Sequence, residues 1–245
     1  MTSSSSLSIG KRIDGVREMG KVGIVLDLLM VFAPFAVLGF IGEFLGDGTV
    51  VGAILINLAY VFSVVIATFV LKSRGSSWRE IGLARPASWR KTILLAVSTL
   101  FAYIVVTIVF QAILVNVLGL TVAPSDRSSF DVLYGNLPLL ILYVAAAWTF
   151  IAFGEEMIFR AYLMNTLAQL FESAKARWAL ALIGSSIIFG LAHFSWGIMG
   201  VAETTLMGLV LGFVYLRSGR NLWITIIAHG IANTLGFTMV YLGAG

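Results

Sequence analysis

Long apolar runs separated by short polar joins form the main pattern of this chain. Runs of about 20 apolar residues have the length that crosses the hydrocarbon core of a bilayer as an α-helix. The pattern predicts seven such helices, at residues 22–42, 50–71, 92–118, 136–156, 178–196, 198–216 and 221–242. The fourth is expected to continue as helix to residue 171, and the short join "SWGIMG" leaves room for an eighth, re-entrant segment. The predicted fold is an all-α, polytopic transmembrane bundle.

Composition supports the same class and limits the number of domains. The chain is 59% hydrophobic and 11% charged, whereas soluble domains hold about 25% charged residues. No polar stretch is long enough to fold alone, so we expect a basic tail at 1–21 and one transmembrane domain at 22–245. The first apolar run is longer than the roughly 7–15 residues of a signal-peptide core, which favours an uncleaved first helix. The absence of cysteine excludes disulfides and thiolate chemistry.

The basic residues predict the orientation of the bundle. Four precede the first run, six lie between the second and third, two follow the fourth and two follow the sixth, which places 14 of the 16 on one side. The positive-inside rule assigns that side to the cytoplasm. We therefore expect a cytoplasmic N-terminus and a multi-pass protein of the plasma (cytoplasmic) membrane. Topology explains the net charge of +4, so no nucleic-acid partner is expected.

Five ionisable residues interrupt the apolar runs where a bilayer should exclude them. The stretch "FGEEMIFRAYL" carries Glu155, Glu156 and Arg160, and the two histidines of the chain, His193 and His229, both fall in predicted spans. Each such residue costs at least about 2.5–3.5 kcal/mol on insertion scales, which makes it a candidate functional residue.

The spacing of the polar residues predicts which of them share a helix face. Glu156 and Arg160 are four residues apart, as are His229 and Asn233, and this spacing places both members on one face. Arg160 could pair with Glu156, or its side chain could reach the cytoplasmic boundary. Three helices could bring a carboxylate, two imidazoles and an amide into one polar pocket.

These residue types favour hydrolysis of an amide bond over other chemistries. The chain has no Cys nucleophile, no G-x-S-x-G elbow and no H-E-x-x-H zinc motif. A buried glutamate can act as general base toward water, and a histidine and an asparagine can donate hydrogen bonds to the oxyanion of a tetrahedral intermediate. The alternative is a zinc site of two histidines and one carboxylate, formed by Glu155, His193 and His229. Spacing alone does not decide between the two.

Three short motifs resemble those of the CAAX-processing and bacteriocin-processing (CPBP, or Abi) intramembrane proteases. They are "EEMIFR" at Glu155–Arg160, "FGLAH" at Phe189–His193 and "HGIAN" at His229–Asn233, which match the family patterns E-E-x-x-x-R, F-x-x-x-H and H-x-x-x-N. Each motif is weak alone, but the three occur in order on successive predicted spans. The resemblance covers residues 145–245, and the first half of the chain matches only as generic membrane helices.

The resemblance implies roles for the motif residues. It implies that Glu155 activates a water molecule with His193 as its partner. It further implies that His229 and Asn233 stabilise the oxyanion, while the remaining motif residues support the site, namely Glu156, Arg160 and Phe189. The family is commonly labelled as metalloproteases, yet a metal-independent glutamate mechanism has also been proposed for its prenyl-protein members, so a divalent metal such as zinc stays open as a cofactor.

The leading hypothesis is an intramembrane endopeptidase that hydrolyses a peptide bond of a membrane-associated protein or peptide. One alternative is a non-catalytic immunity or scaffold protein that retains the motifs. Another is a proton-coupled transporter, but the chain shows no internal repeat of the kind that marks many transporters. Prenylated C-termini, leader peptides and membrane regulators all remain open as substrates.

Overall fold

The computed structural model describes residues 12–13, 16–17, 20–44, 50–120, 123–172 and 176–244. The predicted basic tail at 1–21 lies almost wholly outside these ranges, so the boundary between tail and membrane domain stays a prediction. Within them, two short strands pair antiparallel, β1 (Arg12–Ile13) and β2 (Val16–Arg17).

The rest of the described chain is largely helical, with α-helices that are interrupted or joined by short π-helical and 3-10 segments (η). In chain order these elements are α1 (Lys21–Pro34), η2 (Phe35–Gly39), α2 (Phe40–Phe44), α3 (Val50–Ser73), α4 (Trp89–Ala112), η3 (Ile113–Val117), η4 (Ser128–Leu133), α5 (Leu137–Ala146), η5 (Ala147–Ile151), α6 (Ala152–Glu155), η6 (Glu156–Leu163), α7 (Met164–Ala168), α8 (Arg177–Leu191), η7 (Phe194–Trp196), α9 (Gly197–Arg217) and α10 (Leu222–Tyr241).

The predicted polytopic helical bundle is confirmed. Among the described residues, six helices are long and apolar enough to cross a membrane, namely Lys21–Gly42, Ile54–Ser73, Trp89–Val117, Leu137–Ala168, Phe194–Arg217 and Leu222–Tyr241. The segment predicted as a fifth span at 178–196 is instead the shorter helix α8, of 15 residues. At 1.5 Å per residue α8 is about 22 Å long, less than the roughly 30 Å of hydrocarbon. It stops because the chain turns through η7 and restarts at Gly197, whose φ is 75°.

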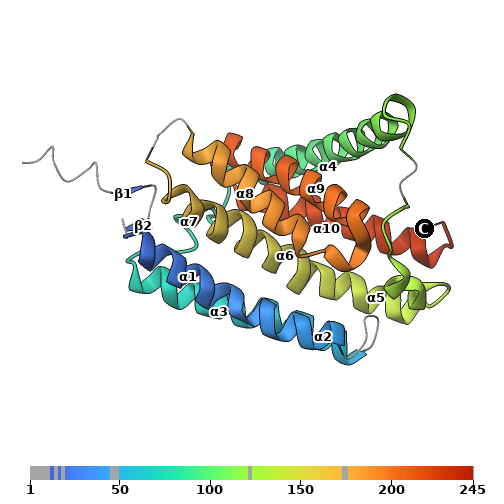
Figure 1. The fold of residues 1–245 in the computed structure, drawn as a ribbon, viewed down its shortest axis with the longest axis horizontal. Coiled ribbons are helices and arrows are strands. Elements are labelled where there is room, and N and C mark those ends of the chain that lie inside the picture. The colour runs from blue at the N-terminus through green and yellow to red at the C-terminus, as the bar shows by residue number, and fades with distance from the viewer. Residues whose placement is uncertain are drawn as a thin grey trace, which may run out of the picture.

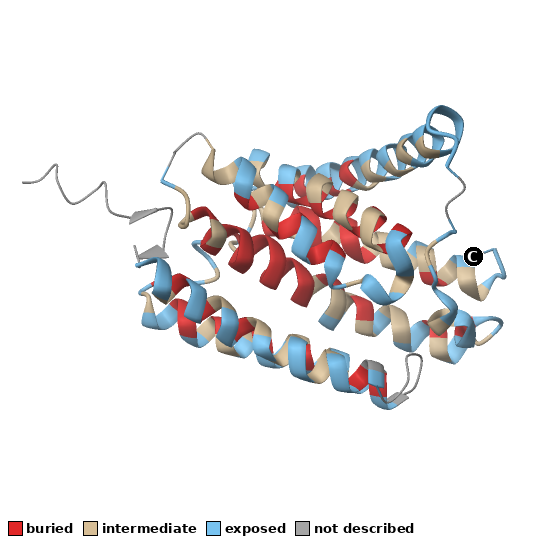
Figure 2. Ribbon diagram, viewed as in Figure 1, coloured by how far each residue is buried: buried red, intermediate tan, exposed pale blue. Residues whose placement is uncertain are grey.

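The helices form two groups around one long central helix (Figure 1). Helices α1 and α3 lie side by side on one flank, α8, α9 and α10 lie on the other, and α4 packs on the outer side of α10 and α9. Buried positions concentrate on α6, η6 and α7 and on the surfaces of α8–α10 that face them (Figure 2). The outward faces of α1, α3 and α4 are exposed, and apolar side chains such as Phe69 and Phe101 project from them.

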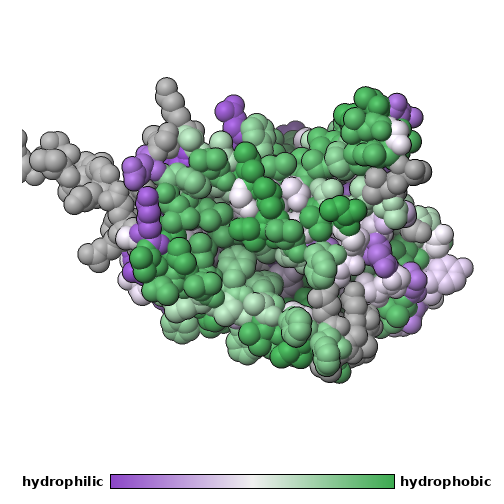
Figure 3. Space-filling model, in the orientation of Figure 1, coloured by the Kyte–Doolittle hydropathy of each residue, from purple (hydrophilic) through white to green (hydrophobic). Residues whose placement is uncertain are grey.

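The surface has the distribution expected of a multi-pass integral membrane protein. Hydrophobic side chains cover the middle of the visible face, and hydrophilic ones gather toward the two ends of the helices (Figure 3). An exposed apolar belt of this kind is lipid-facing, because the bilayer replaces the protein interior as its apolar surroundings.

Hydrogen bonds tie the loop between α3 and α4 to the turn between α9 and α10. The backbone N–H of Leu222 donates to the carbonyl of Gly82 at 3.1 Å, and the Tyr215 hydroxyl donates to the carbonyl of Ile81 at 2.7 Å. At the same end of the bundle, Arg74 forms a two-pronged ion pair with buried Asp27 of α1, at 3.0 and 3.1 Å. This end carries the basic loops, and its assignment to the cytoplasm stays a prediction.

Gly82 packs closely against the turn between α9 and α10, so a substitution there tests whether this contact stabilises the fold. Its φ is 114°, and a Cβ there would lie 2.4 Å from the carbonyl oxygen of Arg220 and 2.8 Å from the Tyr215 ring. We expect Gly82→Ala to lower the free energy of unfolding by about 2–5 kcal/mol, because a left-handed backbone strain adds to overpacking. Denaturant unfolding in detergent, followed by tryptophan fluorescence, measures the change.

Gly75→Ala is the matched control. Gly75 also has a positive φ, of 69°, but open space surrounds its Cβ position, so only the backbone cost of about 1–2 kcal/mol should remain. Equal losses in the two variants would show that the contact of Gly82 with the α9–α10 turn does not constrain the fold.

Candidate active site

The glutamate pair lies in the middle of the long helix that runs from Leu137 to Ala168. Two π-helical segments interrupt this helix, η5 before the pair and η6 from Glu156 onward. Positions 154–166 are all buried, which is typical of a helix surrounded by others at the centre of a bundle. π-helical turns widen the helix locally and occur frequently at functional sites. The charged residues of this stretch therefore face protein on all sides.

Glu156 is the central acceptor of the site. Its Oε1 lies 3.1 Å from Nη1 of Arg160, one turn away, and 2.9 Å from Nδ1 of His229 on α10. All three side chains are buried, with Glu156 at 0% exposure. The Arg160 side chain thus forms the predicted ion pair and does not extend to the membrane boundary. Since an ionised carboxylate only accepts, Nδ1 of His229 carries the hydrogen of this contact.

The other nitrogen of His229 faces the first glutamate of the pair. Nε2 of His229 lies 3.5 Å from Oε2 of Glu155, and the Tyr60 hydroxyl from α3 donates to Oε1 of Glu155. A continuous chain of polar contacts therefore runs from Arg160 through the two glutamates and His229 to Tyr60. Sequence reasoning missed Tyr60, because a tyrosine in an apolar span belongs to no motif and is a common helix-packing residue.

Phe189 of α8 forms one wall of this cluster. The guanidinium carbon of Arg160 lies 4.0 Å from the centre of the Phe189 ring, a cation–π contact. The same ring packs edge-on against both imidazoles, with centroid distances of 4.8 Å to His193 and 6.2 Å to His229. Phe189 therefore contacts both histidines.

His193 lies just beyond the end of α8, half-buried, in contact with Phe189. Its Nδ1 is 2.8 Å from the carbonyl oxygen of Phe189. A carbonyl only accepts, so this contact assigns the ring hydrogen to Nδ1 and leaves a lone pair on Nε2 in the neutral ring. Its imidazole packs against the same Phe189 ring that contacts Arg160 and His229.

Asn233 follows His229 by one turn on α10. It is half-buried, and within the described chain its side chain makes no hydrogen bond. The structure thus brings Glu155, Glu156, Arg160 and His229 into direct contact. His193 joins them through its contact with Phe189, and Asn233 lies one turn from His229 without a hydrogen bond in the described chain.

A loop from the far end of the bundle holds the segment that follows His193. Glu203 of α9 is buried and accepts hydrogen bonds from Gln111 at 2.9 Å and Arg127 at 3.2 Å. The Arg127 guanidinium lies 5.4 Å from the Trp196 ring centre, and that ring packs 4.7 Å from the His193 ring. The orientation of His193 therefore depends on contacts made at the surface of the bundle.

The predicted zinc ligands do not fit a metal site. Among the described residues, no three His, Cys, Asp or Glu side chains come together in an arrangement that could hold a metal ion. Of the candidate ligands, His229 uses Nδ1 to contact Glu156, and His193 packs against the Phe189 ring. We therefore derive no chemical step through a metal.

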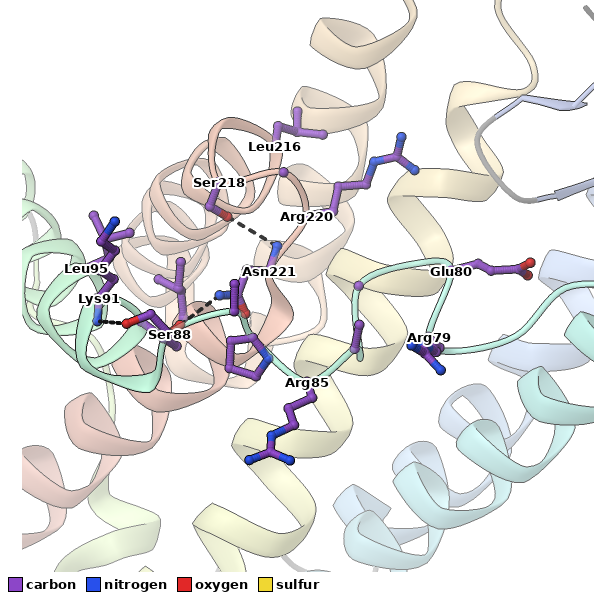
Figure 4. A pocket seen from close by; sticks show the side chains of 17 residues that line it. Arg79, Glu80, Arg85, Ser88, Lys91, Leu95, Leu216, Ser218, Arg220 and Asn221 are labelled. Atoms are coloured by element: carbon purple, nitrogen blue, oxygen red, sulfur yellow. Dashed lines mark hydrogen bonds between the residues drawn. The ribbon is translucent and has the colours of Figure 1, made fainter. Parts of the chain in front are cut away.

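A separate cavity of 1010 Å³ lies at the basic end of the bundle, and none of the motif residues lines it. It is lined by the loop before α4, the first turns of α4 and the turn between α9 and α10 (Figure 4). Arg85 and Lys91 extend away from each other around it rather than toward a common point.

Comparison with known proteins places this site in a matched segment. Residues 137–235 match the family described as Type II CAAX prenyl endopeptidase Rce1-like. The chain is also similar to CAAX prenyl protease 2 of Saccharomyces cerevisiae, at 29% identity over 101 residues that cover 34% of this chain and 32% of that protein. The chain thus aligns with about a third of the length of this curated relative. No solved structure matches the chain.

The buried ion pair predicts a large cost for losing either partner. We expect Arg160→Ala to lower the free energy of unfolding by about 3–5 kcal/mol, because the Glu156 carboxylate would remain buried without its cation. Thermal unfolding in detergent measures the loss. Arg217→Ala is the control, since Arg217 is exposed at the end of α9 and should shift the midpoint little. Similar midpoints for both variants would contradict a stabilising role for the pair.

Proposed function

We propose that this chain is an intramembrane endopeptidase of the CAAX-processing (CPBP) type, because its segment 137–235 matches the family described as Type II CAAX prenyl endopeptidase Rce1-like. Its substrate is a membrane-associated protein or peptide that reaches the polar cluster from the bilayer. The observation that carries the proposal is the buried contact between Glu155 and His229 within that segment, with Glu156 and Arg160 behind it.

Glu155 is the proposed general base. A carboxylate within reach of a water molecule can take its proton as the water oxygen attacks the scissile carbonyl carbon. The lone pair on Nε2 of His193 can accept a second hydrogen from that water, because Nδ1 is occupied by the Phe189 carbonyl. When the C–N bond breaks, the proton held by Glu155 passes to the leaving amine, and the new carboxyl group forms on the other fragment.

His229 and Asn233 are the proposed donors to the oxyanion. Glu156 holds His229 through Nδ1 and so directs Nε2 toward Glu155. With a hydrogen on each ring nitrogen, His229 would donate from Nε2 to developing negative charge. The amide of Asn233, one turn on, makes no hydrogen bond within the described chain and is thus free to donate to the same oxygen.

Loss of the proposed base gives the direct test. We expect Glu155→Ala to lower kcat for cleavage of a labelled peptide library by about 10²–10⁴-fold, the usual contribution of general base catalysis. The purified protein in detergent is assayed by mass spectrometry of the products. Glu172→Ala, which changes a glutamate exposed beyond the end of α7, should keep the wild-type rate.

The same assay separates the enzyme from a non-catalytic immunity or scaffold protein. Cleavage that survives in Glu155→Ala would refute the catalytic role of Glu155. Wild-type protein that captures a membrane partner but cleaves no peptide would favour the scaffold.

Metal dependence has its own test. We expect cleavage to continue after treatment with a chelator, because the described residues do not bring three metal ligands together. Metal content of the purified protein, measured by mass spectrometry before and after chelation, is compared with the rate. Stoichiometric zinc whose removal and restoration abolish and restore cleavage would show that the glutamate mechanism is wrong as written.

A further inference from the structure

Tyr60 lies outside the family-matched segment, yet its hydroxyl forms a hydrogen bond directly with the proposed base, Glu155. It belongs to α3, 95 positions before Glu155 in the chain, and its hydroxyl donates to Oε1 of that residue. We propose that Tyr60 is a positioning residue for the Glu155 carboxylate, an inference that rests on the proposed endopeptidase function.

The two oxygens of the Glu155 carboxylate have different surroundings, which suits them to different roles. Oε1 is held by Tyr60, whereas Oε2 faces Nε2 of His229 at 3.5 Å and makes no hydrogen bond within the described chain. A carboxylate that is bound through one oxygen cannot rotate freely about its last side-chain bond. Oε2 is thereby presented toward His229, where a water molecule and a peptide carbonyl must meet. Orientation of this kind is worth large factors in rate, because a displacement of about 1 Å can cost 10²-fold.

The Tyr60 ring is itself held from two sides. Phe35, the first residue of the π-helical segment η2 that follows α1, packs edge-on against it at a centroid distance of 4.8 Å. On the other side lies Gly154, where a Cβ would come within 3.2 Å of the Tyr60 Cβ. The glycine directly before Glu155 therefore permits α3 to approach α6 closely. The pair α1 and α3, whose outer face is lipid-exposed, contributes its inner face to the site.

Tyr60 does not take part in proton transfer in this scheme. The proton of the attacking water goes to Oε2 of Glu155 and later to the leaving amine, while the phenol keeps its hydrogen and its bond to Oε1. Loss of the hydroxyl should therefore leave substrate binding intact and affect only the chemical step.

Tyr60→Phe tests the proposal, because it removes the hydroxyl and keeps the ring against Phe35. We expect kcat to fall by about 10–100-fold with KM unchanged, as for a misplaced catalytic group. Tyr215→Phe is the matched control: its buried hydroxyl also bridges helices, through the Ile81 carbonyl and the Asn165 side chain, but lies outside the polar cluster. It should lower the unfolding temperature and leave kcat of the folded enzyme at the wild-type value.

The outcomes distinguish this inference from the proposed function. A Tyr60→Phe enzyme with lower thermal stability and wild-type kcat would overturn the positioning role, since Tyr60 would then only tie α3 to α6. If Glu155→Ala is inactive in the same assay, the proposed function stands even when the Tyr60 inference fails. Cleavage that survives in Glu155→Ala refutes the function first.

If the Tyr60→Phe protein does not fold, Gly154→Ala tests the positioning role of Tyr60 instead. This change keeps the hydroxyl but forces Tyr60 to move by a few tenths of an ångström. A fall in kcat with unchanged KM supports the positioning role, and wild-type kinetics overturn it.

Discussion

The buried carboxylate of Glu156 is the constraint on which the rest of the site depends. Moving an ion out of water costs several kcal/mol even after relaxation, and a low-dielectric interior tolerates it only with close partners. The partners of Glu156 include Arg160 from its own helix and His229 from α10. The requirement for both fixes the rotation of the central helix and the approach of α10. It also fixes the His229 ring, whose second nitrogen must then face Glu155.

The burial of this pair explains why the central helix is covered on all sides while other helices are not. Arg160 needs a wall that excludes water, and Phe189 of α8 supplies it with its ring face. Helix α8 is therefore held against the pair, and its short length lets the chain turn back at His193 beside the cluster. Helices α1, α3 and α4 expose most of their outer surface to lipid, and only α3 sends a polar side chain, Tyr60, into the cluster.

The structure also joins the site to both ends of the bundle. At one end, the hydrogen bond from the Leu222 N–H to the Gly82 carbonyl holds the start of α10, the helix that carries His229 and Asn233. At the other end, Arg127 and Glu203 hold Trp196 against His193. The residues that make these connections, Gly82, Arg127, Glu203 and Trp196, belong to none of the three motifs. The geometry of the polar cluster thus depends on residues from the first half of the chain as well as from the matched segment.

Sequence by itself determined the all-α membrane class and the polar residues that converge, because a bilayer imposes a length of apolar run and a penalty on every charge within it. It also determined that Glu156 and Arg160 share a face, since that follows from helical period alone. Only the tertiary structure decided which nitrogen of His229 meets which glutamate, that Phe189 contacts both histidines, that the segment at 178–196 ends early, and that Tyr60 reaches Glu155. Those features depend on distances between residues far apart in the chain, and no local period or composition encodes a distance of that kind.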